Sequence, residues 1–224
     1  MNPNLSATSA LVLLWSGRDL YDSAATKAYW NKLNLAAGSS LLQACNQIWS
    51  HYAQVIINRK WQILRWSREL LAEGKIGQVV IVGAGYAPLG IELAAQFPKV
   101  TVFELDRDGM AEKANLCLGL PGLGGRLKFI QADVTDSATC RDLLKNNDWD
   151  AHAPTLVIME GISYYISLAA TQALWRLFAT GEGASRCIFE YLVPEEDVVA
   201  KRRHIPTRVF GEIAKRCRLS LIHI

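Results

Sequence analysis

The chain has 224 residues, of which half are hydrophobic and a fifth are charged, as is ordinary for a soluble globular protein. The formal net charge is only +3 and the one short basic run spans residues 201–204, which argues against a nucleic-acid partner. This length fits one large domain, or one domain with an appendage.

The sequence shows no sign of a membrane span, a secretory signal or a metal site. The apolar run at residues 10–15 is too short for a span, and no basic segment precedes it. The five cysteines are scattered, with no Cys-x-x-Cys pair and no histidine at metal-ligand spacing. They are interpreted as free thiols in a reducing compartment, so we expect a cytoplasmic protein without a metal centre.

Residues 1–75 are predicted to form a helical cap. Five of the seven tryptophans lie here, and the apolar pattern over residues 41–72 predicts one long helix or two, with Gly74 as a stop. Most of these aromatic side chains are expected to pack the cap onto the rest of the protein. Some of them could line a substrate pocket, because Trp and Tyr join a large apolar face to a polar tip.

Residues 76–224 are predicted to form a second unit in which strands alternate with helices. The predicted strands are residues 78–82, 100–104, 127–131, 155–159, 186–192 and 219–223. The predicted helices are residues 88–97, 107–118, 137–145, 168–180 and 195–216. Such alternation indicates right-handed crossovers and an α/β fold with a mainly parallel sheet.

The first predicted strand, residues 78–82, runs into the turn Gly83-Ala84-Gly85. Glycines let a backbone turn sharply and approach a ligand closely. A dinucleotide-binding turn would carry a third glycine where this chain has Pro88, which has no N–H for a phosphate. S-adenosylmethionine, which has adenosine but no pyrophosphate, is the leading candidate. NAD and a turn without any ligand are the alternatives.

Acidic residues follow the next three predicted strands. Glu104 and Asp106 end the second strand, Asp133 and Val134 follow the third, and Glu160 follows the fourth. Ligands of open α/β sheets lie beyond the carboxyl ends of the strands, so these acids could hold ribose hydroxyls, an adenine amino group and a cationic ligand. Each acid alone could instead cap a helix.

These elements resemble the leucine carboxyl methyltransferase family, which includes related O-methyltransferases of polyketide pathways. The matching segments are residues 78–85, 102–106, 113, 133–134 and 160–165. The resemblance implies a seven-stranded Rossmann-like methyltransferase sheet with helices on both faces and a helical N-terminal cap. It also implies methyl transfer from S-adenosylmethionine to an oxygen, for which we expect a carboxylate or phenolic hydroxyl of a small molecule.

The resemblance also implies roles for the residues of the α/β unit. The turn at residues 83–85 would approach the methionine part of the cofactor. Asp106 would hold the ribose, with Glu104 as the alternative, and Asp133 and Val134 would contact adenine.

Further roles follow for the fourth strand end and the cap. Glu160 would lie near the amino-acid end of the cofactor, and Tyr165 would face the reaction site. Lys27 and Arg59 match basic residues that reach the cofactor carboxylate. A carboxylate acceptor would need no general base, whereas a phenol or alcohol would, and His51 and Tyr165 are the candidates for that base.

The chain departs from the family pattern at two places. The family commonly follows its Gly-Ala-Gly with an apolar residue, Asp, Thr and Arg, where residues 86–89 read Tyr-Ala-Pro-Leu. This stretch is similar to nicotianamine synthase, which transfers the aminocarboxypropyl group of S-adenosylmethionine. The last antiparallel strand of the family sheet has no counterpart before Ile224. Either the chain is truncated, or the sheet edge is altered and another subunit of a homo-oligomer could complete it. A degenerate fold that acts as a binding or scaffold protein is a further alternative.

Overall fold

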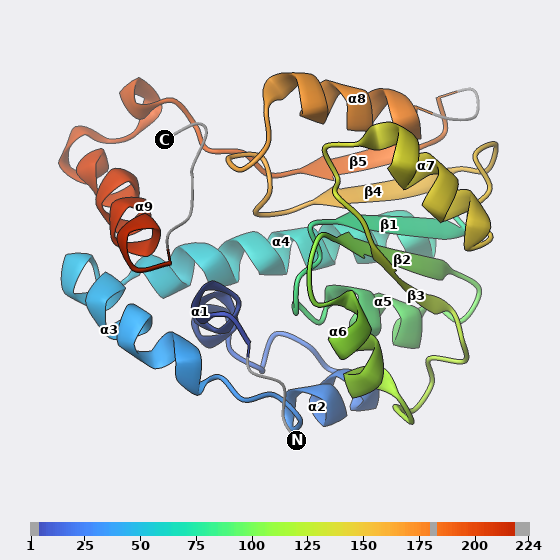
Figure 1. The fold of residues 1–224 in the computed structure, drawn as a ribbon, viewed down its shortest axis with the longest axis horizontal. Helices are drawn as coiled ribbons and strands as arrows, with labels where there is room; N and C mark the ends of the chain where they lie inside the picture. The colour runs from blue at the N-terminus through green and yellow to red at the C-terminus, as the bar shows by residue number, and fades with distance from the viewer. Residues whose placement is uncertain (1–4, 180–182, 218–224) are drawn as a thin grey trace.

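A computed structural model describes residues 5–179 and 183–217, which form a parallel sheet with helices on both faces and a helical layer at one end (Figure 1). The strands are β1 (Gln78–Val82), β2 (Thr101–Asp106), β3 (Leu127–Gln131), β4 (Thr155–Met159) and β5 (Arg186–Phe189). The helices are α1 (Ala7–Ser16), α2 (Ala24–Trp30), α3 (Ser39–Ile48), α4 (Tyr52–Ala72), α5 (Leu89–Gln96), α6 (Met110–Cys117), α7 (Ser137–Asn146), α8 (Leu168–Phe178) and α9 (His204–Cys217).

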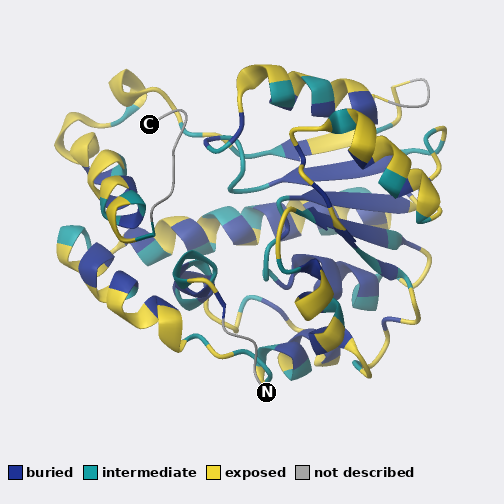
Figure 2. Cartoon of the chain, viewed as in Figure 1, coloured by how far each residue is buried: buried dark blue, intermediate teal, exposed yellow. Residues whose placement is uncertain are grey.

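The five strands are parallel and lie in the order β3-β2-β1-β4-β5. Both β1 and β4 are buried along their whole length, which explains why they read as continuous apolar runs (Figure 2). From β1 the chain continues to β2 and β3 on one side, and β4 and β5 then lie on the other side of β1. Ligands of such sheets bind at the point where the strand order changes direction.

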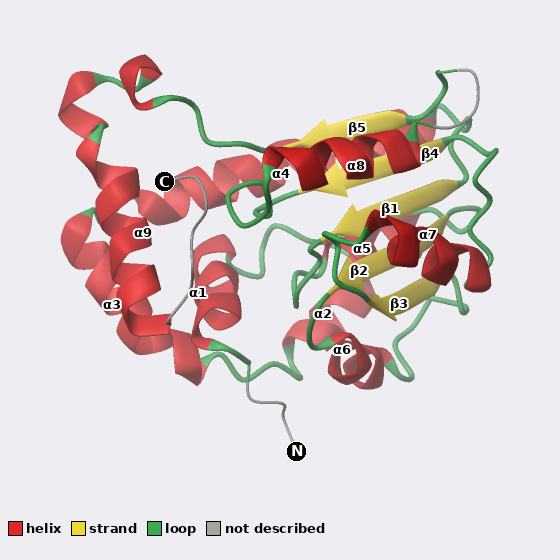
Figure 3. Ribbon diagram, turned by 45° about the horizontal axis from the view of Figure 1, so that its top comes forward, coloured by secondary structure: helices red, strands yellow, loops and turns green. Residues whose placement is uncertain are grey.

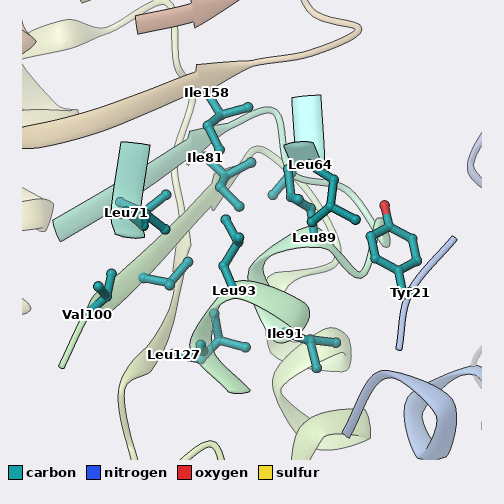
Figure 4. Close-up of a cluster of buried hydrophobic side chains, with 14 of the residues drawn as sticks. Tyr21, Leu64, Leu71, Ile81, Leu89, Ile91, Leu93, Val100, Leu127 and Ile158 are labelled. Carbon is teal, nitrogen blue, oxygen red and sulfur yellow. The ribbon is translucent and has the colours of Figure 1, made fainter. Parts of the chain in front are cut away.

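Helices cover both faces of the sheet, as predicted (Figure 3). One apolar cluster joins β1 and β2 to α4, α5 and α6, and Figure 4 shows Leu64 and Leu71 of α4 beside Ile81 and Ile158 of the sheet. A second cluster joins the other face to α7 and α8. The α/β fold class predicted from the sequence is therefore confirmed.

The helical cap draws on both ends of the chain. Side chains of α1, α3, the first half of α4 and α9 share one apolar cluster, which includes Trp15, Tyr52 and Phe210. The carboxylate of Glu92 in α5 fastens the cap to the sheet, because it accepts hydrogen bonds from the backbone N–H of Asp22 and from Arg68, each at 3.1 Å. The predicted boundary near residue 75 stays a prediction, although apolar clusters cross it.

Most predicted elements appear with small shifts, and the region before α9 is a correction. The predicted helix over residues 195–216 is instead two 3-10 turns, Glu195–Asp197 and Ala200–Arg202, followed by α9. Pro206 explains this, since it fits the first turn of α9 but would break a helix that had begun at residue 195.

The predicted fifth strand is shorter than expected, ending at Phe189 rather than at residue 192. The predicted strand at residues 219–223 lies outside the described residues. Among the described strands, β3 and β5 are the sheet edges, and completion of the sheet by another subunit stays a prediction. No helix among residues 5–179 and 183–217 is both long and apolar enough to cross a membrane.

Candidate functional site

A cleft of about 300 Å³ opens beyond the carboxyl ends of β1, β2 and β4, and we call it the strand-end cleft. Its wall is formed by the turn at residues 83–87, the strand-end acids, residues 160–165, and side chains of α1 and α4. A larger hollow of about 490 Å³ lies beside β5, but its only charged lining residue is Arg186. Of these two hollows, the strand-end cleft is the one whose wall carries several charged side chains.

The glycine turn is shaped for close approach. Gly83 and Gly85 have φ of 72° and 47°, in the left-handed region that favours glycine. A Cβ on Gly83 would lie 3.0 Å from Ile162, whereas a Cβ on Gly85 would meet only Asp106 within 4 Å. The N–H of Gly85 donates to Oδ2 of Asp106 at 2.7 Å, which ties the turn to the end of β2.

The two acids of β2 occupy different environments. Glu104 is fully buried below the first turn of α5, with Oε2 2.6 Å from Nζ of Lys113. Burial raises the pKa of Glu104, and Lys113 offsets this only in part. Asp106 is half-buried on the wall of the cleft, so it is the more accessible of the two.

A network of four charges closes the cap side of the cleft. Glu160 receives Nε of Arg59 at 2.9 Å and Nζ of Lys60 at 3.0 Å, and Glu190 lies 3.5 Å from Arg59. Glu190 also accepts the backbone N–H of Gly161 at 2.9 Å. The two cations and two carboxylates cancel in formal charge, so the network orders this wall without giving it a net charge.

The pKa shifts of this network reflect burial and pairing. Burial alone would raise the pKa of Glu160, but Lys60 and Arg59 hold it below its usual value. Burial lowers the pKa of Lys60, which Glu160 offsets only in part. For Arg59, the pull of Glu160 and Glu190 outweighs burial, so its pKa lies above the usual value.

Two network members, Lys60 and Glu190, were missed by the sequence analysis. Glu190 follows the fifth strand as Glu160 follows the fourth, so the same rule could have found it. The predicted strand ran to residue 192 and placed Glu190 inside it. Nothing in the sequence around Lys60 indicated a role in the site, apart from its position next to Arg59.

Three predicted cofactor residues do not line the cleft. Lys27 is exposed on α2 and borders a separate hollow of about 390 Å³. Asp133 is exposed after β3 and accepts the N–H and hydroxyl of Thr135 at 2.9 and 2.7 Å, as in an Asx turn, and these bonds lower its pKa. Val134 is buried in the cluster under α7. The adenine contacts of Asp133 and Val134 stay predictions.

Tyr165 lies where the strand-end cleft joins a smaller hollow, which we call the cap chamber. The cap chamber is lined by Thr8, Leu11, Val12, Trp15, Tyr52, Ile56, Arg59, Tyr164, Tyr165, Phe210 and Ile213. Burial raises the pKa of Tyr165. His51 is exposed at the start of α4 and lines neither hollow.

The described residues contain no group of three His, Cys, Asp or Glu side chains that could hold a metal ion. The five cysteines are free thiols, three of them buried. The site is therefore one of hydrogen bonds, ion pairs and apolar walls.

Comparisons with known proteins identify a matching family model and similar folds. A family model for leucine carboxyl methyltransferase matches residues 17–179. The fold is similar to a DUF574 family protein from Streptomyces avermitilis, at 18% identity and a TM-score of 0.73 over 98% of this chain and 79% of that one. It is also similar to a Thermobifida fusca protein described as a candidate methyltransferase, at 16% identity and a TM-score of 0.68 over 95% and 78%. No curated protein matches the sequence significantly.

Proposed function

Because the chain belongs to the leucine carboxyl methyltransferase family of S-adenosylmethionine-dependent methyltransferases, we propose that it methylates the carboxylate of a small organic acid. The observation that carries this proposal is that the described walls of the strand-end cleft and cap chamber hold no histidine and no carboxylate without a hydrogen-bond or ion-pair partner. The cofactor residues, the acceptor class and the reacting oxygen are argued in turn below.

The strand-end cleft fits an adenosine cofactor with a charged amino-acid end. Its volume of about 300 Å³ lies at the lower end of the range for small-molecule sites. Gly83 and Gly85 would let the backbone approach the methionine part, and Asp106 would hold the ribose. Glu104 is committed to Lys113, so we assign the ribose to Asp106 alone. Arg59 would reach the cofactor carboxylate, with Glu160 fixing its orientation.

No histidine is among the described residues that line the two hollows, and each carboxylate that lines them already has a partner, Glu104 being paired with Lys113. Asp106 accepts from Gly85, and Glu160 is paired with two cations. The chamber tyrosines are poor bases, since burial raises the pKa of Tyr52 to about 12 and shifts those of Tyr164 and Tyr165 upward. A carboxylate is already ionised at pH 7, whereas a phenol or alcohol would need a base, and the carboxylates of these walls are already engaged by partners.

The bound sulfonium supplies an activated methyl group, so the work of the protein is to position the acceptor and exclude water. The neutral charge network keeps the wall from repelling an anionic acceptor. Tyr165, at the junction of the two hollows, would contact the acceptor and orient it. We therefore assign Tyr165 a contact role in catalysis and no proton transfer.

The cofactor assignment is tested by calorimetry with S-adenosylmethionine, S-adenosylhomocysteine and NAD. We expect micromolar binding of the first two, weakened about tenfold or more in Asp106→Ala. Asp108→Ala is the matched control, because Asp108 is exposed two residues further on and should leave binding unchanged. Tight NAD binding, or no binding of any of the three, would contradict the assignment and favour an oxidoreductase or a scaffold.

The reaction is tested by turnover of methyl-labelled S-adenosylmethionine with a panel of small carboxylic acids. A methyl ester releases labelled methanol in base, whereas a phenol ether does not. We expect base-labile product and a kcat/KM that stays flat from about pH 6 to 9. Formation of methylthioadenosine would instead indicate aminocarboxypropyl transfer, and base-stable product would indicate methylation of a phenol.

A further inference from the structure

The cap chamber adjoins the strand-end cleft. The two hollows share Thr8, Val12, Arg59, Tyr164 and Tyr165. A molecule whose reacting oxygen lies in the cleft beside Tyr165 can therefore extend its remaining atoms between α1, α4 and α9.

The chamber favours an uncharged group. Apart from Arg59, none of its described lining residues carries a formal charge at neutral pH. Arg59 is already paired with Glu160 and Glu190, and under the proposed function it also holds the cofactor carboxylate from the side of the cleft. A charged group in this space would be desolvated without a free partner, which is costly.

The chamber is also small. Its volume is about 50 Å³, against about 300 Å³ for the cleft. One water occupies roughly 10–15 Å³ on this scale, so the chamber has room for about three to five water-sized groups. A long alkyl chain or a fused ring system would not fit without moving the cap.

One polar atom in the chamber wall has no partner. Trp15 is 3% exposed, and its indole Nε1 finds no hydrogen-bond acceptor among the described residues. Its ring is held in place by Tyr52, with the ring centres 5.0 Å apart. Buried N–H groups nearly always have a partner, so the unpaired N–H of a side chain that lines the chamber is a candidate donor to the bound molecule.

We propose that the cap chamber holds the tail of the methyl acceptor, a short uncharged group with one oxygen that accepts a hydrogen bond from Trp15. This inference rests on the proposed function, because it takes the reacting carboxylate to lie in the strand-end cleft. It adds a recognition element that selects an oxo-substituted short-chain acid over its hydrocarbon counterpart.

The test compares two acids that differ only at this oxygen. In 4-oxopentanoate a carbonyl oxygen stands where 4-methylpentanoate has a methyl group, and the two tails have nearly the same shape. Their binding to the full chain is measured by calorimetry with S-adenosylhomocysteine at saturation. We expect at least a threefold preference for the oxo acid, and a preference below twofold in Trp15→Phe, which keeps the ring and removes the donor.

Several results would overturn the proposal. These are a preference below threefold in the unmodified protein, a preference that survives in Trp15→Phe, or binding of neither acid while S-adenosylhomocysteine binds. Dodecanoate that binds as tightly as the short acids would refute the size limit. Failure of S-adenosylhomocysteine itself to bind would instead refute the proposed function, and the two failures are therefore distinguishable.

A second variant guards against misfolding of Trp15→Phe. Ile213→Phe adds volume to the chamber from α9, and Ile213 does not line the strand-end cleft. We expect it to weaken both short acids about tenfold or more and to leave the affinity for S-adenosylhomocysteine within twofold. Unchanged binding of the acids in this variant would place their tails outside the chamber.

Discussion

Glu104 and Glu160 make an instructive pair, because they lie at the ends of the two strands that flank β1. Glu104 belongs to β2, is fully buried, and pairs with the single cation Lys113. Glu160 follows β4, lines the strand-end cleft as Glu104 does, and pairs with both Arg59 and Lys60. The pKa of the first is raised by burial, whereas two cations lower that of the second.

The difference shows that a strand-end acid can serve the fold or the site. One buried cation leaves Glu104 with a net desolvation cost, so this pair fastens α6 to the sheet without adding much stability. Two cations, Arg59 and Lys60, stabilise the charged form of Glu160, and Glu160 in turn holds Arg59 at the wall of the cleft. The number of cations around each acid separates the two roles.

Removing the cation from the buried pair is expected to have the largest effect. Lys113→Met leaves Glu104 buried without a partner and should lower the free energy of unfolding by about 3–5 kcal/mol at pH 7, as measured in urea. Lys75→Met removes an exposed lysine and should change it by less than about 0.5 kcal/mol. The double variant Lys113→Met/Glu104→Gln should recover much of the loss, and no recovery would show that the pair is not coupled.

A methyl group placed against Glu104 should have the next largest effect. In Gly90→Ala the new Cβ would collide with the Glu104 carboxylate, and we expect a loss of about 1–3 kcal/mol in the free energy of unfolding. Gly211→Ala in α9 is the control, since its Cβ would meet nothing and the change should stabilise the helix by about 0.5–1 kcal/mol. Equal effects of the two variants would contradict tight packing around Glu104.

Replacing Glu160 by its neutral amide is expected to weaken cofactor binding. Glu160→Gln removes the carboxylate that orients Arg59, and we expect the Kd of S-adenosylhomocysteine to rise about tenfold, or about 1.4 kcal/mol. Glu69→Gln, which breaks an exposed pair on the same helix as Arg59, should leave the Kd unchanged. A Kd within twofold of the unmodified protein for Glu160→Gln would remove Glu160 from the site.

The smallest effects are expected in the pH dependence of stability, where the two acids should act with opposite sign. The pKa of Glu104 is raised, so relative to Glu104→Gln the protein should lose stability as the pH rises above about 4.3. The pKa of Glu160 is lowered, so relative to Glu160→Gln it should lose stability as the pH falls below about 4.3. Urea unfolding of the unmodified protein and of each variant between pH 3 and 7 measures these two differences in stability. If both differences changed with pH in the same direction, the contrast between Glu104 and Glu160 would be refuted.

The sheet was predictable from the sequence because its central strands are buried on both faces. The apolar runs of β1 and β4 follow directly from that burial, and the glycine turn follows from backbone geometry. The choice between Glu104 and Asp106 as the candidate ribose ligand needed the structure. It depends on which of the two acids forms the ion pair with Lys113 of α6.

The cap and its chamber were much harder to predict. The chamber is lined by side chains of α1, α4 and α9, which lie far apart in the sequence. A periodic pattern of apolar residues predicts one helix at a time, and it does not predict which distant helices pack together. Helix α9 begins at His204, two residues before Pro206, and not at residue 195 as predicted. Glu190 follows β5, which ends earlier than its apolar pattern indicates. Residues brought together only by tertiary packing leave no local signal.

The cap cluster also has a consequence for biosynthesis. Its members range from Leu11 in α1 to Ile213 in α9, whereas the glycine turn and Asp106 lie within about 25 residues of each other. Domains form progressively as a chain leaves the ribosome, and contacts between distant segments form late. The glycine turn and Asp106, which would hold the ribose, can therefore come together on the nascent chain before the cap chamber that would select the acceptor.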